Sequence, residues 1–321
     1  MNNNTSSKRP ENRFYDDDED DKASSVVLIP GLPDHLAQQC LSAVPPSLLY
    51  GVCRSWRRFI YSPSFPPFYC LYALLSPSSS MASPSIEFLS LDPVSTKWTR
   101  LPSPPPEPPL KILHRHPSFI SRTLPVQSLA VSGKLLLVAG TTHNFLPALD
   151  RPLGFDPSSG EWFSGPPFTA PRRWCATGSV HGQVYVASGV GSGYQGDVAR
   201  SLEKWDVSEK PGDWKWEKLT SLKNGQFCRE AVEGVGYKGS LRRYKAEDDS
   251  WEEVIQSSEY LKGAERIAVE RGKVCAVSGR GRWVTVVDVA ARPARIWVVN
   301  PPPEMEFIAV HILPRMKNVE N

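Results

Sequence analysis

A short glycine-marked pattern recurs from residue 126 onward, and this repeat constrains the fold more than any other feature of the sequence. Three segments align with one another: SGKLLLVAG (132–140), HGQVYVASG (181–189) and RGKVCAVSG (271–279). Each has a turn glycine and a polar residue, then an unbroken apolar strand, then a small residue and a glycine. The first two turn glycines are 49 residues apart, and the next interval, 90 residues, is close to two units of 45. Such a period predicts that each repeat is one supersecondary unit.

A tryptophan marks a second position in the repeat. It follows an apolar strand residue by seven positions in LDPVSTKW (91–98), FDPSSGEW (155–162) and YKAEDDSW (244–251). Together the two patterns predict a four-stranded antiparallel meander, which cannot cover both of its own faces. Units arranged radially cover one another, so we expect a mainly β fold of the β-propeller type. The 31 prolines among 321 residues agree with this, because proline interrupts long helices.

One repeat is interrupted. In a complete repeat the turn glycine precedes the second motif by 22 residues (Gly133 to Phe155), whereas Gly239 precedes Tyr244 by only five. The segment AVEGVGYKG runs directly into SLRRYKAEDDSW, and the buried second strand that belongs between them is absent. By this internal comparison at least about 17 residues are missing at Gly239–Ser240, and the loss of one further whole repeat would leave the same junction. We therefore expect about five blades, one of them incomplete.

The two ends of the repeat region predict how the propeller closes. Three strand-like runs on the N-terminal side (68–75, 86–91 and 98–101) lack a first partner, and FIAVHILP (307–314) is left over after the last repeat. We expect this C-terminal strand to complete the N-terminal blade, because closure removes a free sheet edge and ties the two ends together. The propeller then covers residues 63–315 and is followed by a short tail, 316–321.

Apolar residues at helical spacing distinguish residues 26–62 from the strands that follow. The pattern predicts two short amphipathic helices separated by Val44-Pro45-Pro46. So short a segment cannot bury both apolar faces by itself, and part of this surface must meet the rest of the chain or a partner. Residues 1–25 are predicted to be a disordered acidic tail, because the run DDDEDD repels itself and buries nothing.

Charge and cysteine usage exclude several classes of protein. The net charge of +3 is too small to indicate nucleic acid as a partner. We find neither a signal peptide nor a membrane-spanning stretch, so no membrane association is expected. The six cysteines are scattered without metal-ligand spacing, which predicts no metal, no cofactor and reduced thiols in the cytoplasm or nucleus. The segment Gly191–Gly196 fits G-x-G-x-x-G, but only a few residues separate it from the next strand, so we interpret it as a loop.

Two sets of residues together resemble a known family. The segment Leu32-Pro33-Asp34-His35-Leu36, with Cys40-Leu41, Val44-Pro45 and Val52-Cys53-Arg54-Ser55-Trp56-Arg57, resembles an F-box, although it is a few residues shorter than usual. The glycine-ended strand with its spaced tryptophan resembles the kelch repeat, here with Ala-Gly or Ser-Gly in place of Gly-Gly. In this order they are similar to plant F-box/kelch-repeat proteins of the Skp1-interacting-partner group. The resemblance covers roughly residues 28–315 and implies a six-bladed parent.

The resemblance implies an adaptor of an SCF (Skp1-cullin-F-box) ubiquitin ligase that carries no chemistry of its own. The F-box at 26–62 would bind a Skp1-like protein, and through it a cullin, while the propeller would capture a target protein. The Skp1-binding residues would be the apolar ones of the motif: Leu32, Pro33, Leu36, Leu41, Pro45, Leu48, Leu49, Val52 and Trp56. The alternative for these helices is a cap that folds onto the propeller without a partner.

Several arginines fall in the loops expected on one side of the propeller, just before the first strand of a repeat or after its second. A ring of arginines could hold an acidic or phosphorylated segment of a target. The alternative is that they pair with neighbouring carboxylates or stack on the tryptophans between blades. The candidate target-binding residues are Arg172, Arg173, Tyr194, Arg229, Arg266 and Arg280.

Three further functions remain open at this point. The chain could be a stand-alone kelch interaction module without a ligase role. It could be a propeller enzyme, although no arrangement of serine, cysteine, histidine and aspartate in the sequence indicates nucleophilic catalysis. It could also be a product whose interrupted repeat abolishes target binding, so that the F-box competes for Skp1.

Overall fold

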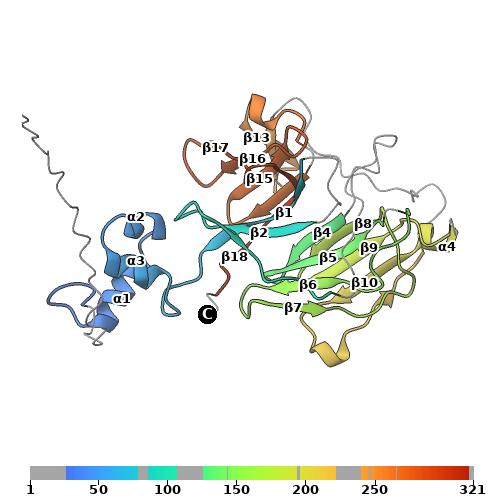
Figure 1. Cartoon of the computed structure of the whole chain (residues 1–321). Coiled ribbons are helices and arrows are strands. Elements are labelled where there is room, and N and C mark those ends of the chain that lie inside the picture. Colours follow the sequence, from blue (N-terminus) through green and yellow to red (C-terminus); the bar gives the residue numbers. More distant parts are fainter. Residues whose placement is uncertain are drawn as a thin grey trace, which may run out of the picture.

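The computed structural model of the chain is mainly β, with three short helices set to one side of the strands (Figure 1). It describes residues 27–78, 86–106, 126–221 and 240–317, apart from 143, 194–195, 246 and 265. The acidic tail at 1–25 lies outside the described residues. The strands form four four-stranded sheets and one two-stranded sheet in a propeller arrangement. Among the described residues, no helix is long and apolar enough to span a membrane.

Each sheet is one blade, and all strand pairs are antiparallel. The first blade has the order β18-β1-β2-β3, the second β4 to β7, the third β8 to β11 and the last β14 to β17, while β12 and β13 form the incomplete blade. The strands are β1 (Tyr69–Pro77), β2 (Glu87–Leu91), β3 (Trp98–Arg100), β4 (Val126–Val131), β5 (Lys134–Gly140), β6 (Leu153–Asp156), β7 (Glu161–Ser164), β8 (Ala176–Val180), β9 (Gln183–Ala187), β10 (Leu202–Asp206), β11 (Glu217–Lys218), β12 (Leu241–Lys245), β13 (Ser250–Ile255), β14 (Arg266–Glu270), β15 (Lys273–Ser278), β16 (Trp283–Asp288), β17 (Arg295–Val299) and β18 (Met305–Pro314).

The turn glycines of the repeat join the first two strands of three blades in two-residue hairpins. In the β4–β5 turn, Ser132 and Gly133 have φ of 49° and 76°. The β8–β9 and β14–β15 turns likewise contain two consecutive positive-φ residues, the second of which is glycine. This backbone matches the right-handed twist of the flanking strands, and glycine adopts it without a steric cost. The repeat pattern therefore marked real blade positions.

An aspartate that sequence reasoning passed over organises the turn between the third and fourth strands. Its carboxylate accepts the backbone N–H two residues further on, as Asp92 Oδ1 does from the Val94 N–H at 2.7 Å. The same bond occurs at Asp156, Asp206 and Asp288. Such turns are a common local use of aspartate. The incomplete blade has Lys245 at the end of β12 instead.

The prediction that the C-terminal strand completes the N-terminal blade is confirmed. β18 pairs with β1 over its length, so that Tyr72 lies opposite His311 and Cys70 opposite Leu313. The Tyr72 hydroxyl also donates to the Pro314 carbonyl at 2.9 Å. Residues from the two ends of the domain thus make one blade, and most of β18 is buried.

The apolar core lies between blades rather than within them. Tyr72 of the first blade and Phe155 of the second share one cluster, and similar clusters join the second blade to the third and the last to the first. Spaced tryptophans anchor the second blade to the first and the third blade to the second. The Trp162 ring packs 5.0 Å from that of Phe88, and its indole N–H donates to the Pro102 carbonyl at 2.8 Å. Trp216 makes the corresponding bond to Pro166 at 3.1 Å.

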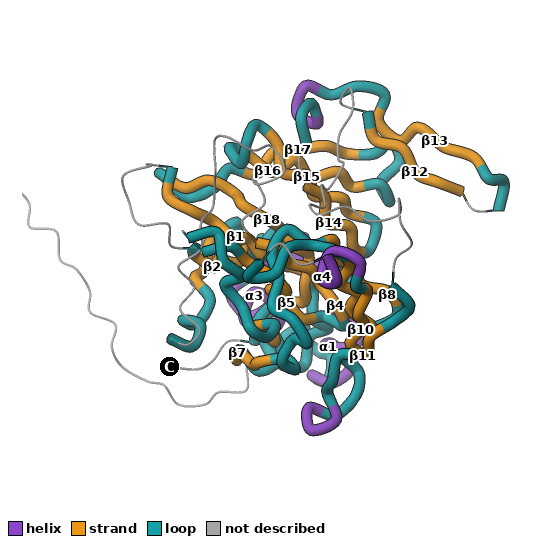
Figure 2. The backbone as a smooth tube through the Cα atoms, turned by 90° about the vertical axis from the view of Figure 1, so that its right-hand side faces the viewer, coloured by secondary structure: helices purple, strands orange, loops and turns teal. Residues whose placement is uncertain are grey.

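Among the described residues, the predicted incomplete blade is a two-stranded hairpin. The inner strands of the complete blades lie side by side in the order β14, β18, β4 and β8 (Figure 2). The β12–β13 hairpin packs on the last blade, where Leu241 and Ile255 contact a cluster that contains Val274 of β15 and Val287 of β16. The segment that the repeat assigns to the first strand of this blade, 231–239, lies outside the described residues.

Apolar side chains on both neighbours of the incomplete blade are exposed. On β14, Ala268 packs towards the first blade, while Ile267 and Val269 point the other way and are 42% and 64% exposed. On β8, Val180 is 54% exposed. Trp251 of the hairpin, which occupies the repeat position of the packed Trp162, is 66% exposed. These surfaces are the ones that the inner strands of a complete blade cover elsewhere in the propeller.

Candidate functional site

Three helices precede the propeller, where the sequence predicted two. They are α1 (Asp34–Ser42), α2 (Pro46–Tyr50) and α3 (Arg54–Ile60). α2 begins at Pro46, where the missing proline N–H costs nothing. The expected second helix is broken at 51–53, because Gly51 ends α2 and Cys53 adopts an extended conformation with φ of −156°. The predicted separation at Val44-Pro45-Pro46 lies between α1 and α2.

The helices share a small apolar cluster, and two of the predicted Skp1-binding residues lie inside it. Leu41 and Leu49 are 3% and 1% exposed and pack with Phe59, Ile60 and Phe65. They hold the helices together and do not lie on a surface. Trp56 packs partly against the same cluster and donates its indole N–H to the Leu28 carbonyl at 2.7 Å, while Leu32 is half-buried.

The other predicted residues face solvent. Leu36, Leu48 and Val52 are 40%, 65% and 58% exposed, and Pro33 and Pro45 are exposed as well. Apolar side chains on α1, on α2 and just after α2 therefore point away from the cluster that the helices share. Three large apolar side chains exposed within so short a helical segment make this segment a candidate interaction site.

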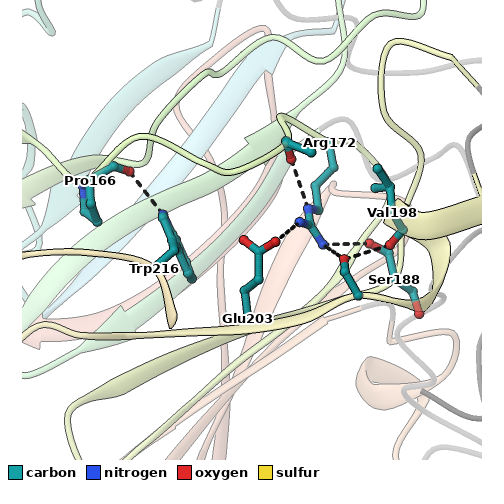
Figure 3. Close-up of polar contacts among 8 residues, drawn as sticks. Pro166, Arg172, Ser188, Val198, Glu203 and Trp216 are labelled. Atoms are coloured by element: carbon teal, nitrogen blue, oxygen red, sulfur yellow. Dashed lines mark hydrogen bonds and ion pairs between the residues drawn. The ribbon is translucent and has the colours of Figure 1, made fainter. Parts of the chain in front are cut away.

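Arg172 forms a buried polar network in the third blade instead of an exposed binding site (Figure 3). Its guanidinium donates to Glu203 Oε1 at 2.8 Å, to Ser201 Oγ at 2.5 Å and to the Ala170 carbonyl at 3.3 Å. The Arg172 and Glu203 side chains are 1% and 3% exposed. Arg172 therefore pairs with a neighbouring carboxylate, which was the alternative to target binding. The pair links the segment before β8 to β10.

Arg173 is also buried, at 3% exposure. Its guanidinium donates to the Gly191 carbonyl at 2.5 Å and lies 4.6 Å from the centre of the Trp174 ring. Its backbone pairs with Val190 in an isolated bridge. Gly189 makes this approach possible, because a Cβ there would lie 2.8 Å from the Arg173 carbonyl oxygen. The glycine that ends this repeat segment, Gly189, is therefore explained by the close packing of its backbone against Arg173.

The remaining candidate target-binding residues do not form one cluster among the described residues. Arg266 is partly buried and donates to the Ile308 carbonyl on β18. Arg280 lies in the turn between β15 and β16, with φ of 60°. Tyr194 and Arg229 lie outside the described residues. The structure therefore does not bring these arginines together with Arg172 and Arg173 into an exposed ring.

A buried histidine on one of the inner strands was missed by sequence reasoning. His311 on β18 is 8% exposed, and its Nε2 lies 2.9 Å from Ser128 Oγ on β4. Burial, with the charge of Arg266, lowers the pKa of His311 to about 3, so this side chain is neutral in the folded protein. The sequence could have indicated a buried histidine here, because His311 is the single polar residue within the apolar run FIAVHILP.

Three observations bear on catalysis and cofactors. The described residues contain no group of side chains that could hold a metal ion. Burial raises the pKa of the Cys70, Cys175 and Cys275 thiols to about 12, so none is an activated nucleophile. The segment Gly191–Gly196 joins β9 to the antiparallel β10, with the single helical turn α4 (Gly196–Arg200) after it. A dinucleotide site needs parallel strands there.

The fold and the helices define a class: a kelch-type propeller preceded by a helical module with an exposed apolar surface. No protein-family model matches the chain. It is 41% identical to the F-box/kelch-repeat protein SKIP25 of Arabidopsis thaliana, over 90% of each chain. It is 27% identical to the Arabidopsis F-box/kelch-repeat protein At2g44130, over 66% of this chain and 57% of that one. The chain belongs to the F-box/kelch-repeat family.

The first of these relatives also bears on the interrupted repeat. The match to SKIP25 spans 356 positions, although the whole chain has 321 residues. Some positions of the relative therefore have no counterpart here, as expected for a chain that lacks part of a repeat.

Proposed function

We propose that the chain is the substrate-recognition adaptor of an SCF ubiquitin ligase. Its F-box binds a Skp1-like protein, and through it a cullin, while the propeller captures a target protein in the cytoplasm or nucleus. The observation that carries this proposal is the exposed apolar surface formed by Leu36, Leu48 and Val52. Burial of apolar side chains against a partner is the main source of affinity in such interfaces.

The propeller contributes position rather than chemistry. Its packed blades form a rigid scaffold, and the loops between strands are the places where a scaffold of this kind carries recognition. Of the arginines considered above, Arg280 is exposed in such a loop, whereas Arg172 and Arg173 are buried. We assign no catalytic residue, because holding a target close to the subunits that transfer ubiquitin needs only proximity and orientation.

Co-purification with a Skp1-like protein tests this function. Leu48→Asp and Val52→Asp each place a charge on the exposed apolar surface, and the high exposure of both side chains means that neither change disturbs the helix cluster. A buried unpaired carboxylate costs several kcal/mol, so we expect the affinity to fall by at least about 100-fold. Val180→Asp is the matched control, since this valine has similar exposure but lies on the propeller.

The outcomes separate the two functions. Loss of binding in the two F-box variants, with the Val180→Asp chain unchanged, supports the adaptor. Absence of binding by a folded wild-type chain contradicts it and leaves a stand-alone kelch interaction module.

A further inference from the structure

Three segments that are far apart in the sequence meet at one tyrosine between the F-box and the propeller. Tyr61 directly follows α3 and caps it. Asp92 lies in the turn between β2 and β3, and Arg315 directly follows the closing strand β18. The junction therefore joins the F-box to both ends of the propeller domain.

Tyr61 is held at two points. Its hydroxyl donates to Asp92 Oδ2 at 2.6 Å, and its carbonyl accepts a hydrogen bond from Arg315 Nη2 at 3.1 Å. The Arg315 guanidinium also lies 5.2 Å from the centre of the Tyr61 ring. Burial and the bond to Asp92 raise the pKa of Tyr61, so the phenol remains a donor at neutral pH. One side chain and its own backbone are thus fixed by two different parts of the propeller.

Both partners of Tyr61 are themselves fixed. The other oxygen of Asp92 accepts the backbone N–H groups of Val94 and Ser95 at 2.7 and 3.3 Å, which orients the carboxylate. The backbone N–H of Arg315 donates to the Phe68 carbonyl at 2.7 Å. The Phe68 ring packs edge-on against Tyr61, with 6.0 Å between ring centres. Groups that are oriented in advance lose little freedom on contact and therefore define one geometry.

These contacts determine how the two parts of the molecule can move. The covalent connection is a single stretch, 61–68, without regular secondary structure. Units joined by one short linker normally move relative to one another unless an interface holds them. Here Asp92, in the turn between β2 and β3, and Arg315, just after β18, add two non-covalent connections to the first blade.

We propose that Tyr61, Asp92 and Arg315 are positioning residues that fix the direction in which the propeller presents a target relative to the Skp1-bound F-box. This inference rests on the proposed function. Transfer between bound partners depends steeply on orientation, so a fixed junction restricts which lysines of a bound protein reach the ubiquitin donor.

Distance distributions between two spin labels test the junction without any partner. One label is placed on Cys40, which is exposed on α1, and the other on Ser158→Cys in an exposed turn of the second blade, with Cys53 and Cys228 replaced by serine. The variant Tyr61→Phe/Arg315→Met keeps the ring and the aliphatic stem but removes both polar contacts. The control Arg100→Met removes an exposed ion pair with Glu87 in the same blade.

We expect one narrow distance in the parent and in the control, and a distribution at least about twofold wider in the double variant. An unchanged width in the double variant, or a broad distribution in the parent, overturns the proposal. Circular dichroism confirms that each chain is folded. If the double variant does not fold, the single variant Tyr61→Phe is measured instead, and the width of its distance distribution is compared with that of the parent in the same way.

Ubiquitin transfer in a reconstituted ligase tests the consequence, with the chain itself as acceptor and mass spectrometry to identify the modified lysines. We expect few modified lysines in the parent and a wider set in the double variant, with unchanged affinity for Skp1. A wider distance distribution with the same set of lysines overturns the positioning role. If the parent does not bind Skp1, the proposed function is refuted instead, and the distance distribution still decides whether the junction is rigid.

Discussion

Acid should destabilise this protein in part through one histidine, His311. The side chain is buried on β18 beside Ser128, and burial holds its pKa at about 3, against 6.5 in an unfolded chain. Above pH 6.5 neither state binds a proton at this site. Between pH 6.5 and about 3 the unfolded state is protonated and the folded state is not, so stability falls as the pH falls.

The magnitude follows from the same two values. Each pH unit below 6.5 costs about 1.4 kcal/mol, so acidification from pH 7.5 to 5.0 should lower the free energy of unfolding by about 2 kcal/mol through this residue. The variant His311→Gln is similar in size, can still bond to Ser128 and does not titrate. The loss of stability on acidification should therefore be about 2 kcal/mol smaller in the variant than in the wild type.

Urea denaturation followed by tryptophan fluorescence at both pH values measures this difference. His35→Gln, which removes an exposed histidine from α1, is the control and should behave as the wild type. Equal losses of stability in the wild type and in His311→Gln would refute the reasoning, because another group would then account for the pH dependence.

Two further predictions concern the third blade. Arg172→Ala leaves the Glu203 carboxylate buried and unpaired and should lower the free energy of unfolding by about 3–5 kcal/mol, whereas Arg172→Met/Glu203→Leu should recover most of this loss; equal urea midpoints for the two variants would contradict this. Gly189→Ala should cost about 1–3 kcal/mol, because the residue has φ of 97° and an added Cβ would lie 2.8 Å from the Arg173 carbonyl oxygen. Gly178→Ala on β8 has open space and should change the thermal midpoint by little, so similar midpoints for both alanine variants would refute the steric argument.

The propeller could be predicted from the sequence because its repeat records local requirements. A two-residue hairpin needs positive φ, which glycine supplies, and a strand covered on both faces by neighbouring blades is continuously apolar. The position of the incomplete blade followed from the same spacing, since a missing strand shortens the interval between turn and tryptophan. The closing strand followed from counting strands without partners.

The candidate site could be predicted less well, because it depends on contacts between distant residues. The sequence around Arg172 contains no pattern that predicts its ion pair with Glu203. This pair depends on how the segment that leads into the third blade packs against β10. In the F-box, Leu41 and Leu48 are both apolar residues of short helices, yet one is buried and the other exposed. A helix of five or nine residues has too few turns for periodicity to show which face is covered.

The position of β18 affects the order in which the molecule matures during synthesis. A ribosome releases the F-box cluster, whose core runs from Leu41 to Phe65, long before it makes residues 305–314. The first blade therefore lacks its innermost strand until the strands of all the other blades have been made, and Arg315 arrives later still. A chain truncated before residue 305 would carry an intact F-box cluster next to a first blade that lacks its innermost strand.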